Sequence, residues 1–299
     1  MGPRWNRLPI LEAIVLGIVQ GLTEFLPVSS TAHLALVPWL VTRLGLANWS
    51  DPGLTFDVAL HAGTLLAILL YFWRTWIQIL RAAFGGKVVR FSETSDNHGD
   101  LTPEEQRRER LLLWFMIAAT IPAGLVGAVL QKRIETTFRA PALVAAMLII
   151  VAIVMLIAER VGRYSKPLSQ ISFVDAMTVG VLQAFAVIPG VSRSGITISG
   201  GLFRNFTRDA AARFSFLLST PIIAGAALLK LHHVMKEGLP PGMATGFAVG
   251  MIVSAIVGYA TIAWFIRYLQ TKTLRPFVIY RIILGVAILV LGYFGGFTG

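Results

Sequence analysis

The sequence contains no cysteine, and few of its 299 residues carry a charge. Without cysteine there are no disulfides, no thiolate catalysis and no cysteine metal sites. Asp and Glu together number only 15, charged residues make up 14% of the chain, and hydrophobic residues make up 56%. The mean hydropathy is +0.72. A water-soluble protein of this composition would have little polar surface, so we expect an all-α integral membrane protein.

The basic residues lie in short loops between apolar runs and give a net charge of +11. This pattern favours anchoring and orientation in an anionic bilayer over nucleic-acid binding. If segment 74–110 faces the cytoplasm, so do segments 160–166, 204–213 and 267–275, and that side then holds most of the 26 Lys and Arg residues. Both termini would face outward. No cleaved signal peptide is expected, because no small-residue cleavage site follows the first apolar run.

Six apolar runs are long enough to span a membrane, and two more are interrupted. The first interrupted segment begins near Ile10, fails at Glu24–Pro27 and resumes at the serines 29 and 30. The second breaks at Pro189-Gly190. Each half is too short to span, and proline disfavours a continuous helix, so both segments are predicted to be re-entrant hairpins. The six expected spans are Leu54–Trp73, Leu111–Gln131, Pro141–Ala158, Ala210–Leu231, Met243–Ile266 and Pro276–Tyr293.

The two interrupted segments belong to an internal repeat. Glu12-Ala13 precedes Gln20 at the same spacing as Asp175-Ala176 precedes Gln183, and both copies continue to a proline and a serine cluster. Each copy then has three spans, and an odd number of spans forces opposite orientations in the membrane. We therefore expect one membrane domain over residues 1–299, built as an inverted-topology repeat of residues 8–160 and 170–297.

The chemistry-bearing residues gather at the two breaks. Gln20 and Glu24 share a helix face, and Ser30 and His33 share a face of the next helix. Helix N-termini and hydroxyls favour an anion, and Arg193 suits bidentate phosphate binding. Glu24 could hold a divalent metal or act as a base, and His33 could be a nucleophile or a general acid. These residues predict a phosphate or diphosphate site.

Structural readings of the same residues remain open. Glu24 could only pair with Arg193 to hold the hairpins together, the serines could be helix caps, and His33 could be a packing residue. Asp57 and His61 are equally compatible with a capping or a site role. The candidate binding residues of the site are Gln20, Ser29, Thr31, Ser192, Ser194 and Thr197.

The residues at both breaks resemble the motifs of the undecaprenyl-diphosphate phosphatase family, the bacitracin-resistance type of membrane phosphatase. The resemblance covers essentially the whole chain and is carried by Gln20–His33, Phe56–Thr64, 189–201 and Phe214–Pro221. It implies hydrolysis of undecaprenyl diphosphate to undecaprenyl phosphate and inorganic phosphate, which recycles the lipid carrier for peptidoglycan synthesis and confers bacitracin resistance. It also implies a divalent cation, Mg²⁺ or Ca²⁺, and action at the outer face of the bacterial inner membrane.

The same resemblance assigns roles residue by residue. Glu24, Ser30, His33 and Arg193 match the catalytic positions, with Ser30 preferred as nucleophile and Glu24 as the metal candidate. Gln20 stands where some members have glutamate, which places more weight on Glu24. The expected partner is the lipid diphosphate in the bilayer, not nucleic acid, and a homo-oligomer is compatible with the resemblance. A prenyl-phosphate transporter or flippase is the alternative, because inverted repeats with broken helices are usual in secondary transporters.

Overall fold

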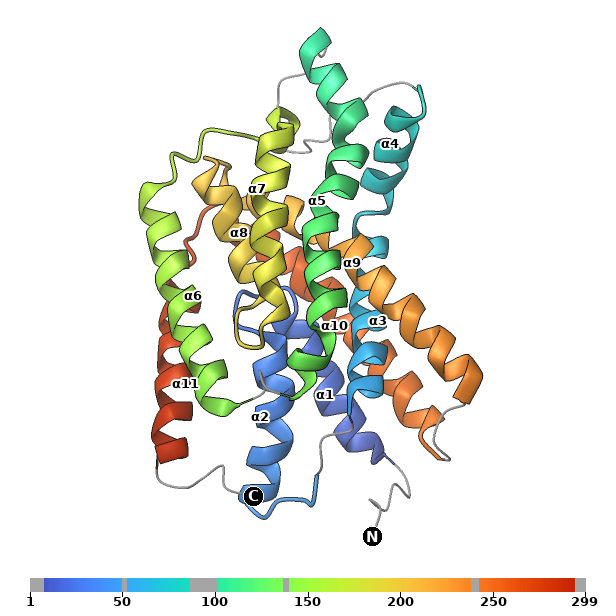
Figure 1. Ribbon diagram of the computed structural model, residues 1–299, viewed down its shortest axis with the longest axis vertical. Coiled ribbons are helices and arrows are strands. Elements are labelled where there is room, and N and C mark those ends of the chain that lie inside the picture. Colours follow the sequence, from blue (N-terminus) through green and yellow to red (C-terminus); the bar gives the residue numbers. More distant parts are fainter. Residues whose placement is uncertain (1–7, 50–52, 87–101, 137–139, 238–241, 294–299) are drawn as a thin grey trace.

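The computed structural model describes residues 8–49, 53–86, 102–136, 140–237 and 242–293, and these residues form helices without strands (Figure 1). The helices are α1 (Ile10–Thr23), α2 (Ser30–Arg43), α3 (Leu54–Tyr71), α4 (Trp73–Ala83), α5 (Pro103–Thr136), α6 (Pro141–Val161), α7 (Phe173–Ala184), α8 (Arg193–Phe203), α9 (Arg208–Glu237), α10 (Ala244–Leu269) and α11 (Arg275–Tyr293), with single 3₁₀ turns at Leu168–Gln170 and Phe185–Val187. The predicted all-α class is confirmed.

Long apolar helices surround a largely apolar interior that contains a cluster of buried polar residues. Within the described residues, five helices (α5, α6, α9, α10 and α11) are long and apolar enough to cross a membrane, and α3 with α4 would make a sixth. Large apolar side chains such as Leu125 (62% exposed) and Ile283 (63%) cover the outside, whereas Gln20 and Arg281 are fully buried. Water would disfavour so much exposed apolar surface and a lipid bilayer would not. The fold is therefore that of a multi-pass helical membrane protein.

The first predicted span ends in a sharp bend. The chain turns by 72° at Phe72 and continues as α4, in a segment that the sequence had suggested to be a polar loop. Ile79 and Ala82 form the buried face of α4, which packs against α5. Helix α5 begins at Pro103, ahead of the span expected from Leu111, at the helix start that Thr102-Pro103-Glu104-Glu105 predicts. The expectation of a loop fails at α4, because packing between α4 and α5 stabilises helix where the local sequence is polar.

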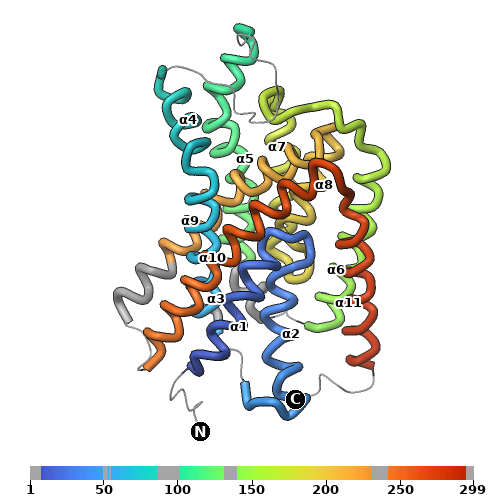
Figure 2. The backbone as a smooth tube through the Cα atoms, turned by 180° about the vertical axis from the view of Figure 1, so that it is seen from behind, coloured from blue at the N-terminus to red at the C-terminus, as the bar shows by residue number. Residues whose placement is uncertain are grey.

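The two interrupted segments form helical hairpins that enter from opposite ends of the molecule and meet near its middle (Figures 1 and 2). Helix α1 ends at Thr23 and α2 starts at Ser30, while α7 and its 3₁₀ turn end at Val187 and α8 starts at Arg193. The breaks therefore lie where the prolines predict them. The residue before each second helix, Ser29 (φ 79°) or Ser192 (φ 68°), has the same left-handed backbone. The repeat thus extends to backbone conformation.

The first helix of each hairpin packs against a long helix from the other half of the chain. Helix α1 packs along α10, and α7 packs along α5. Small residues permit the close approach: a Cβ atom at Gly17 would lie 2.8 Å from the Gly250 carbonyl oxygen and 3.0 Å from the Val253 Cβ. Such contacts between small residues are how helices associate where lipid removes the hydrophobic driving force. The two halves are therefore interleaved.

The start of α7 is held by a charged network. Asp175 sits in a capping box with Ser172 and also accepts hydrogen bonds from Lys166 and from Arg204 Nε at 2.7 Å. Burial raises the pKa of the Asp175 carboxyl, but the hydrogen bonds from Lys166, Ser172 and Arg204 outweigh it and hold this pKa below its usual range. The network ties α7 to the end of α8, which fixes the second hairpin at its base.

Candidate active site where the two breaks meet

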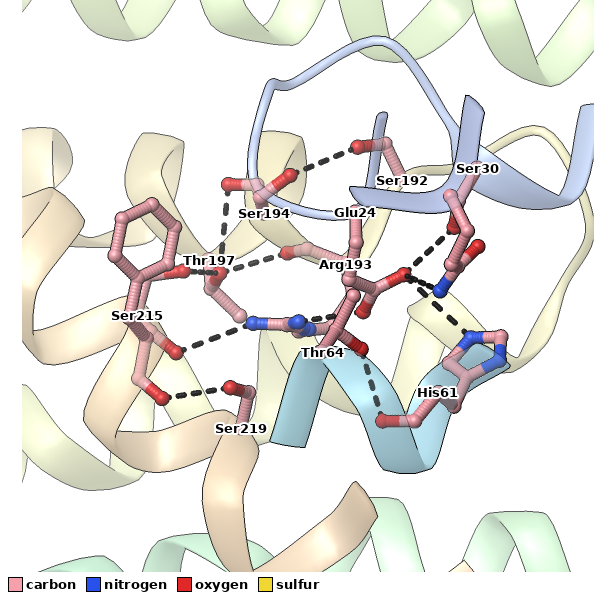
Figure 3. Close-up of polar contacts among 12 residues, drawn as sticks. Glu24, Ser30, His61, Thr64, Ser192, Arg193, Ser194, Thr197, Ser215 and Ser219 are labelled. Carbon is pink, nitrogen blue, oxygen red and sulfur yellow. Dashed lines mark hydrogen bonds and ion pairs between the residues drawn. The ribbon is translucent and has the colours of Figure 1, made fainter. Parts of the chain in front are cut away.

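Glu24 is the centre of the cluster of buried polar residues (Figure 3). Its Oε2 accepts hydrogen bonds from Ser30 Oγ at 2.8 Å and from Gln20 Nε2 at 3.1 Å. Its Oε1 accepts from Arg193 Nη2 at 2.6 Å, which joins the first hairpin to the second. The Glu24 and Arg193 side chains are only 6% and 11% exposed, so this is a nearly dry ion pair. The structure brings four of the predicted site residues together.

The guanidinium of Arg193 lies between Glu24 and helix α9. Its Nη1 donates to the Ser215 carbonyl oxygen at 3.4 Å, and Thr197 on the next turn of α8 is 2.6 Å from the Ser215 hydroxyl. Thr197 also donates to the Arg193 carbonyl oxygen at 2.7 Å and is fully buried. The Ser215 carbonyl oxygen therefore holds the Arg193 guanidinium, and Thr197 joins α8 to α9 beside it.

The serines on either side of Arg193 point toward structural partners. Ser192 caps α8 by accepting from the Gly195 N–H at 3.2 Å, and Ser194 donates to the Leu26 carbonyl oxygen in the first break at 3.1 Å. The prediction that they bind substrate is untested by these contacts. Their observed role is to cap α8 and to join the two breaks.

Helix α2 begins without a side-chain cap. The hydroxyls of Ser29 and Thr31 contact each other at 3.1 Å, and Ser30 projects to Glu24. The first N–H groups of a helix lack partners within the helix and carry the positive end of its dipole. The Ser29 side chain makes no capping hydrogen bond to these N–H groups, which suit an anion bound beside Ser30.

His33 follows Ser30 by one turn of α2, but its ring is hydrogen-bonded to partners outside this cluster. Its Nδ1 is 2.7 Å from the Ser29 carbonyl oxygen, and its Nε2 is 2.7 Å from the Tyr280 hydroxyl on α11. The two rings are stacked with centroids 5.7 Å apart. The structure therefore does not bring the His33 ring to Glu24, and its predicted catalytic role remains a prediction.

A different histidine reaches Glu24. His61 Nε2 on α3 lies 3.5 Å from Glu24 Oε2, while His61 Nδ1 is held by the Asp57 carbonyl oxygen at 2.7 Å. The sequence left His61 undecided between a structural and a site role. The sequence signals were its place one turn after Asp57 in an apolar helix and within the Phe56–Thr64 motif, and the approach to Glu24 depends on how α3 packs beside the first break. The His61 side chain is 27% exposed, compared with 6% for Glu24.

Arg281 connects the two breaks through hydrogen bonds to main-chain carbonyl groups of both. It is fully buried and donates to the carbonyl oxygens of Pro27 in the first break (3.2 Å) and of Gly190 (2.9 Å) and Val191 (3.1 Å) in the second. Two further bonds reach Met147 and Leu148 on α6. No sequence pattern assigned this arginine a role. A charge at this depth requires polar partners, and here main-chain carbonyl groups provide them.

The described residues contain no group of three or more His, Asp or Glu that could hold a metal by itself. Glu24 supplies one carboxylate, and the Gln20 Oε1 atom beside it is buried without a hydrogen-bond partner. Mg²⁺ often binds through one or two protein oxygens together with substrate phosphates. The donor set therefore fits a cation that arrives with a phosphorylated ligand.

Taken together, the long apolar helices, the two broken hairpins and the buried Glu24–Arg193 pair define a multi-pass membrane protein with a polar site at the depth of its hydrophobic belt. Such intramembrane charges are typically functional. The site combines a cation, a helix N-terminus, a serine and a carboxylate, which is the equipment for binding and cleaving a phosphate ester or anhydride.

The chain belongs to the family of the bacitracin resistance protein BacA, whose model matches residues 13–287. It is 46% identical over 285 residues to an undecaprenyl-diphosphatase of Desulforudis audaxviator, covering 95% of this chain and 98% of that protein. It is 44% identical over 281 residues to an undecaprenyl-diphosphatase of Geobacter metallireducens, covering 94% and 97%. The corresponding protein of Moorella thermoacetica is 42% identical over 281 residues. The family resemblance seen in the sequence is confirmed.

Proposed function

We propose that this protein is an undecaprenyl-diphosphate phosphatase, which hydrolyses undecaprenyl diphosphate to undecaprenyl phosphate and inorganic phosphate. The observation that carries the proposal is the contact of Glu24 with both Ser30 and Arg193 at the meeting point of the breaks. Full-length relatives named undecaprenyl-diphosphatase support the same activity. The reaction would recycle the lipid carrier for peptidoglycan and so serve cell wall biogenesis, cell shape and bacitracin resistance.

Substrate binding would begin with the terminal phosphate. Its oxygens would accept hydrogen bonds from Arg193 and from the open N–H groups at the start of α2. An anionic phosphate competes with Glu24 for the guanidinium. Once Arg193 turns to the phosphate, the Glu24 carboxylate keeps Ser30, Gln20 and His61 as its partners and can accept a proton.

The proposed chemistry is a double displacement at the terminal phosphorus. Ser30 Oγ forms a bond to phosphorus, and the bond from phosphorus to the bridging oxygen breaks, with its electron pair leaving on undecaprenyl phosphate. The serine proton moves to Glu24 Oε2, the atom to which it already donates. Water then attacks the phosphoserine and passes one proton to a phosphate oxygen. The bond from phosphorus to Oγ breaks as Oγ takes its proton back from Glu24, and inorganic phosphate leaves with both water protons.

A divalent cation, Mg²⁺ or Ca²⁺, belongs to the proposal. Glu24 and the Gln20 Oε1 atom would hold it together with oxygens of the substrate. When bound, such a cation neutralises charge that develops on the phosphate oxygens. The partnerless Gln20 Oε1 supports this placement. Replacing Gln20 with leucine should therefore raise the cation concentration needed for half-maximal phosphate release.

We also propose the finer architecture: six spans and two re-entrant hairpins, arranged as an inverted repeat in the bacterial inner membrane with the site open to the outer side. The hairpins that enter from opposite ends support it (Figure 2). The equivalent packing in the two halves, of α1 on α10 and of α7 on α5, also supports it.

Phosphate release from undecaprenyl diphosphate by the purified protein in detergent tests the activity. We expect release that stops with a chelator and returns with added Mg²⁺ or Ca²⁺. Absence of release at any cation concentration would leave lipid transport, the alternative that shares this architecture. Transport is measured separately, by loss of a labelled prenyl phosphate from one leaflet of reconstituted vesicles.

A further inference from the structure

The His33 ring is occupied at both nitrogens. Nδ1 contacts the Ser29 carbonyl oxygen, an acceptor only, so Nδ1 carries the proton and donates it at 2.7 Å. Nε2 must then be the acceptor, and the Tyr280 hydroxyl at 2.7 Å donates to it. Stacking of the two rings fixes their orientation. Neither nitrogen of this buried ring is available to a phosphorus atom or to a transferred proton.

The acceptor of His33 is a strained residue. Ser29 has φ 79° and ψ 96°, a left-handed backbone that side-chain-bearing residues seldom adopt. Such a conformation persists only where its surroundings enforce it. The Ser29 carbonyl oxygen accepts two hydrogen bonds from His33, one from the ring at 2.7 Å and one from the main-chain N–H at 3.3 Å. Ser29 itself is 1% exposed.

The strained residue directly precedes the reactive one. Ser29 sets the direction in which α2 starts, and with it the position of the Ser30 hydroxyl against Glu24 and of the open N–H groups. In the second break the equivalent residue, Ser192, is held by its own side chain on the Gly195 N–H. Ser29 has no such cap, so His33 and Tyr280 perform this task from α2 and α11.

We propose that His33 and Tyr280 are positioning residues, which hold the Ser29 carbonyl and thereby aim Ser30 and the start of α2 at the substrate phosphate. The inference rests on the proposed phosphatase function for its consequence, but its geometry does not depend on that function. In this role His33 transfers no proton. Its hydrogen-bonding capacity matters, and its titration does not.

Two amide substitutions separate positioning from proton transfer. Asparagine at position 33 can place an N–H near the Nδ1 position and keep the bond to Ser29, whereas glutamine places its amide near Nε2. We expect His33→Asn to retain turnover within about tenfold of the parent, and His33→Ala and His33→Gln to lose about ten- to a hundredfold, as when a buried hydrogen bond loses one partner. The pH dependence of kcat in His33→Asn should have the parental shape.

Tyr280→Phe supplies the matched control, because it removes one hydroxyl and leaves the stacked ring. We expect it to lower kcat by roughly two- to tenfold, the effect of one neutral hydrogen bond, with KM and the pH profile little changed. Loss of one limb of the pH profile in His33→Asn, at an unchanged melting temperature, would overturn the proposal. Equal loss in His33→Asn and His33→Ala would do the same.

A readout without turnover keeps this inference separate from the proposed function. ¹⁵N NMR of the histidine side chains, with the His33 signals assigned by their absence in His33→Asn, should show the proton on Nδ1 and an acceptor Nε2. Tyr280→Phe should shift the Nε2 signal. Protonation on Nε2 instead would overturn the positioning role, whereas absent phosphate release with the expected NMR signals would overturn only the phosphatase function.

Discussion

Glu24 carries four contacts on two oxygen atoms, and this density of contacts marks it as the residue on which the site depends. Its proximity to Gln20 on one helix face and its attraction to Arg193 follow from sequence spacing and charge. The carboxylate accepts hydrogen bonds from Ser30 in the first hairpin and from Arg193 in the second. Both sets of contacts form only when the two hairpins are in position.

His61 shows where residue-level prediction ends. Its sequence context gives a histidine in an apolar helix, which is equally consistent with packing. Only the packing of α3 beside the first break places Nε2 3.5 Å from Glu24. Likewise, the charge of Arg281 could be read from the sequence but its five carbonyl partners could not, because they come from three distant segments.

His61→Ala should lower kcat about tenfold or more, because it removes a polar neighbour from Glu24, the proposed proton acceptor, in a nearly dry site. The measurement is phosphate release at saturating undecaprenyl diphosphate, with the melting temperature as the control for folding. Parental turnover in a folded His61→Ala protein would show that the contact with Glu24 has no catalytic consequence.

At the scale of single elements, the breaks were predictable and their support was not. Pro27, Pro189 and the serine clusters mark where the helices stop and restart, since proline disrupts and serine begins a helix. The bend at Phe72 and the helix α4 escaped prediction. They depend on burial of Ile79 and Ala82 against α5, which no local pattern reports.

Arg281→Lys should destabilise the protein and reduce its turnover. A lysine cannot reach the carbonyl groups of both breaks at once, since it has one ammonium where arginine has a five-donor fork. We expect the free energy of unfolding to fall by about 2–4 kcal/mol, within the range for removing partners from a buried charge network. The measurement is the melting temperature, which should be lower. Arg275→Lys, the same change at the exposed start of α11, is the control and should have little effect.

Gly17→Val should also destabilise, by separating α1 from α10. The valine side chain would overlap the Gly250 carbonyl group and Val253. Overpacking of this kind typically lowers the free energy of unfolding by about 1–3 kcal/mol. Gly124→Val on α5 is the matched control, because nothing lies within 4 Å of a Cβ there. Similar melting temperatures for the two variants would contradict the close packing of the first hairpin on the second half of the chain.

At the scale of the whole molecule, composition alone predicted an all-α membrane protein. A chain so rich in apolar residues must expose many of them, and lipid accommodates such a surface where water does not. The repeat in the sequence also predicted that the two breaks meet. Orientation rests on the distribution of basic residues and is a separate proposal.

The absence of cysteine makes that orientation directly testable. A membrane-impermeant thiol reagent applied to intact cells should label Leu46→Cys, in the exposed turn after α2, and should label Glu104→Cys at the start of α5 only after permeabilisation. The end of α2 and the start of α5 lie at opposite ends of the molecule (Figure 1). The reverse labelling pattern would invert the topology and open the site to the cytoplasm.

The central claim is that two hairpins from opposite halves of the chain form one catalytic site, and a double-mutant cycle on phosphate release tests it most directly. We expect Glu24→Gln and Arg193→Gln each to lower kcat/KM for undecaprenyl diphosphate by about a hundredfold or more, and the double variant to be little worse than the poorer single variant, because residues that act as a unit are not additive. Near-parental turnover in either folded single variant, or losses that multiply in the double variant, would contradict a shared site.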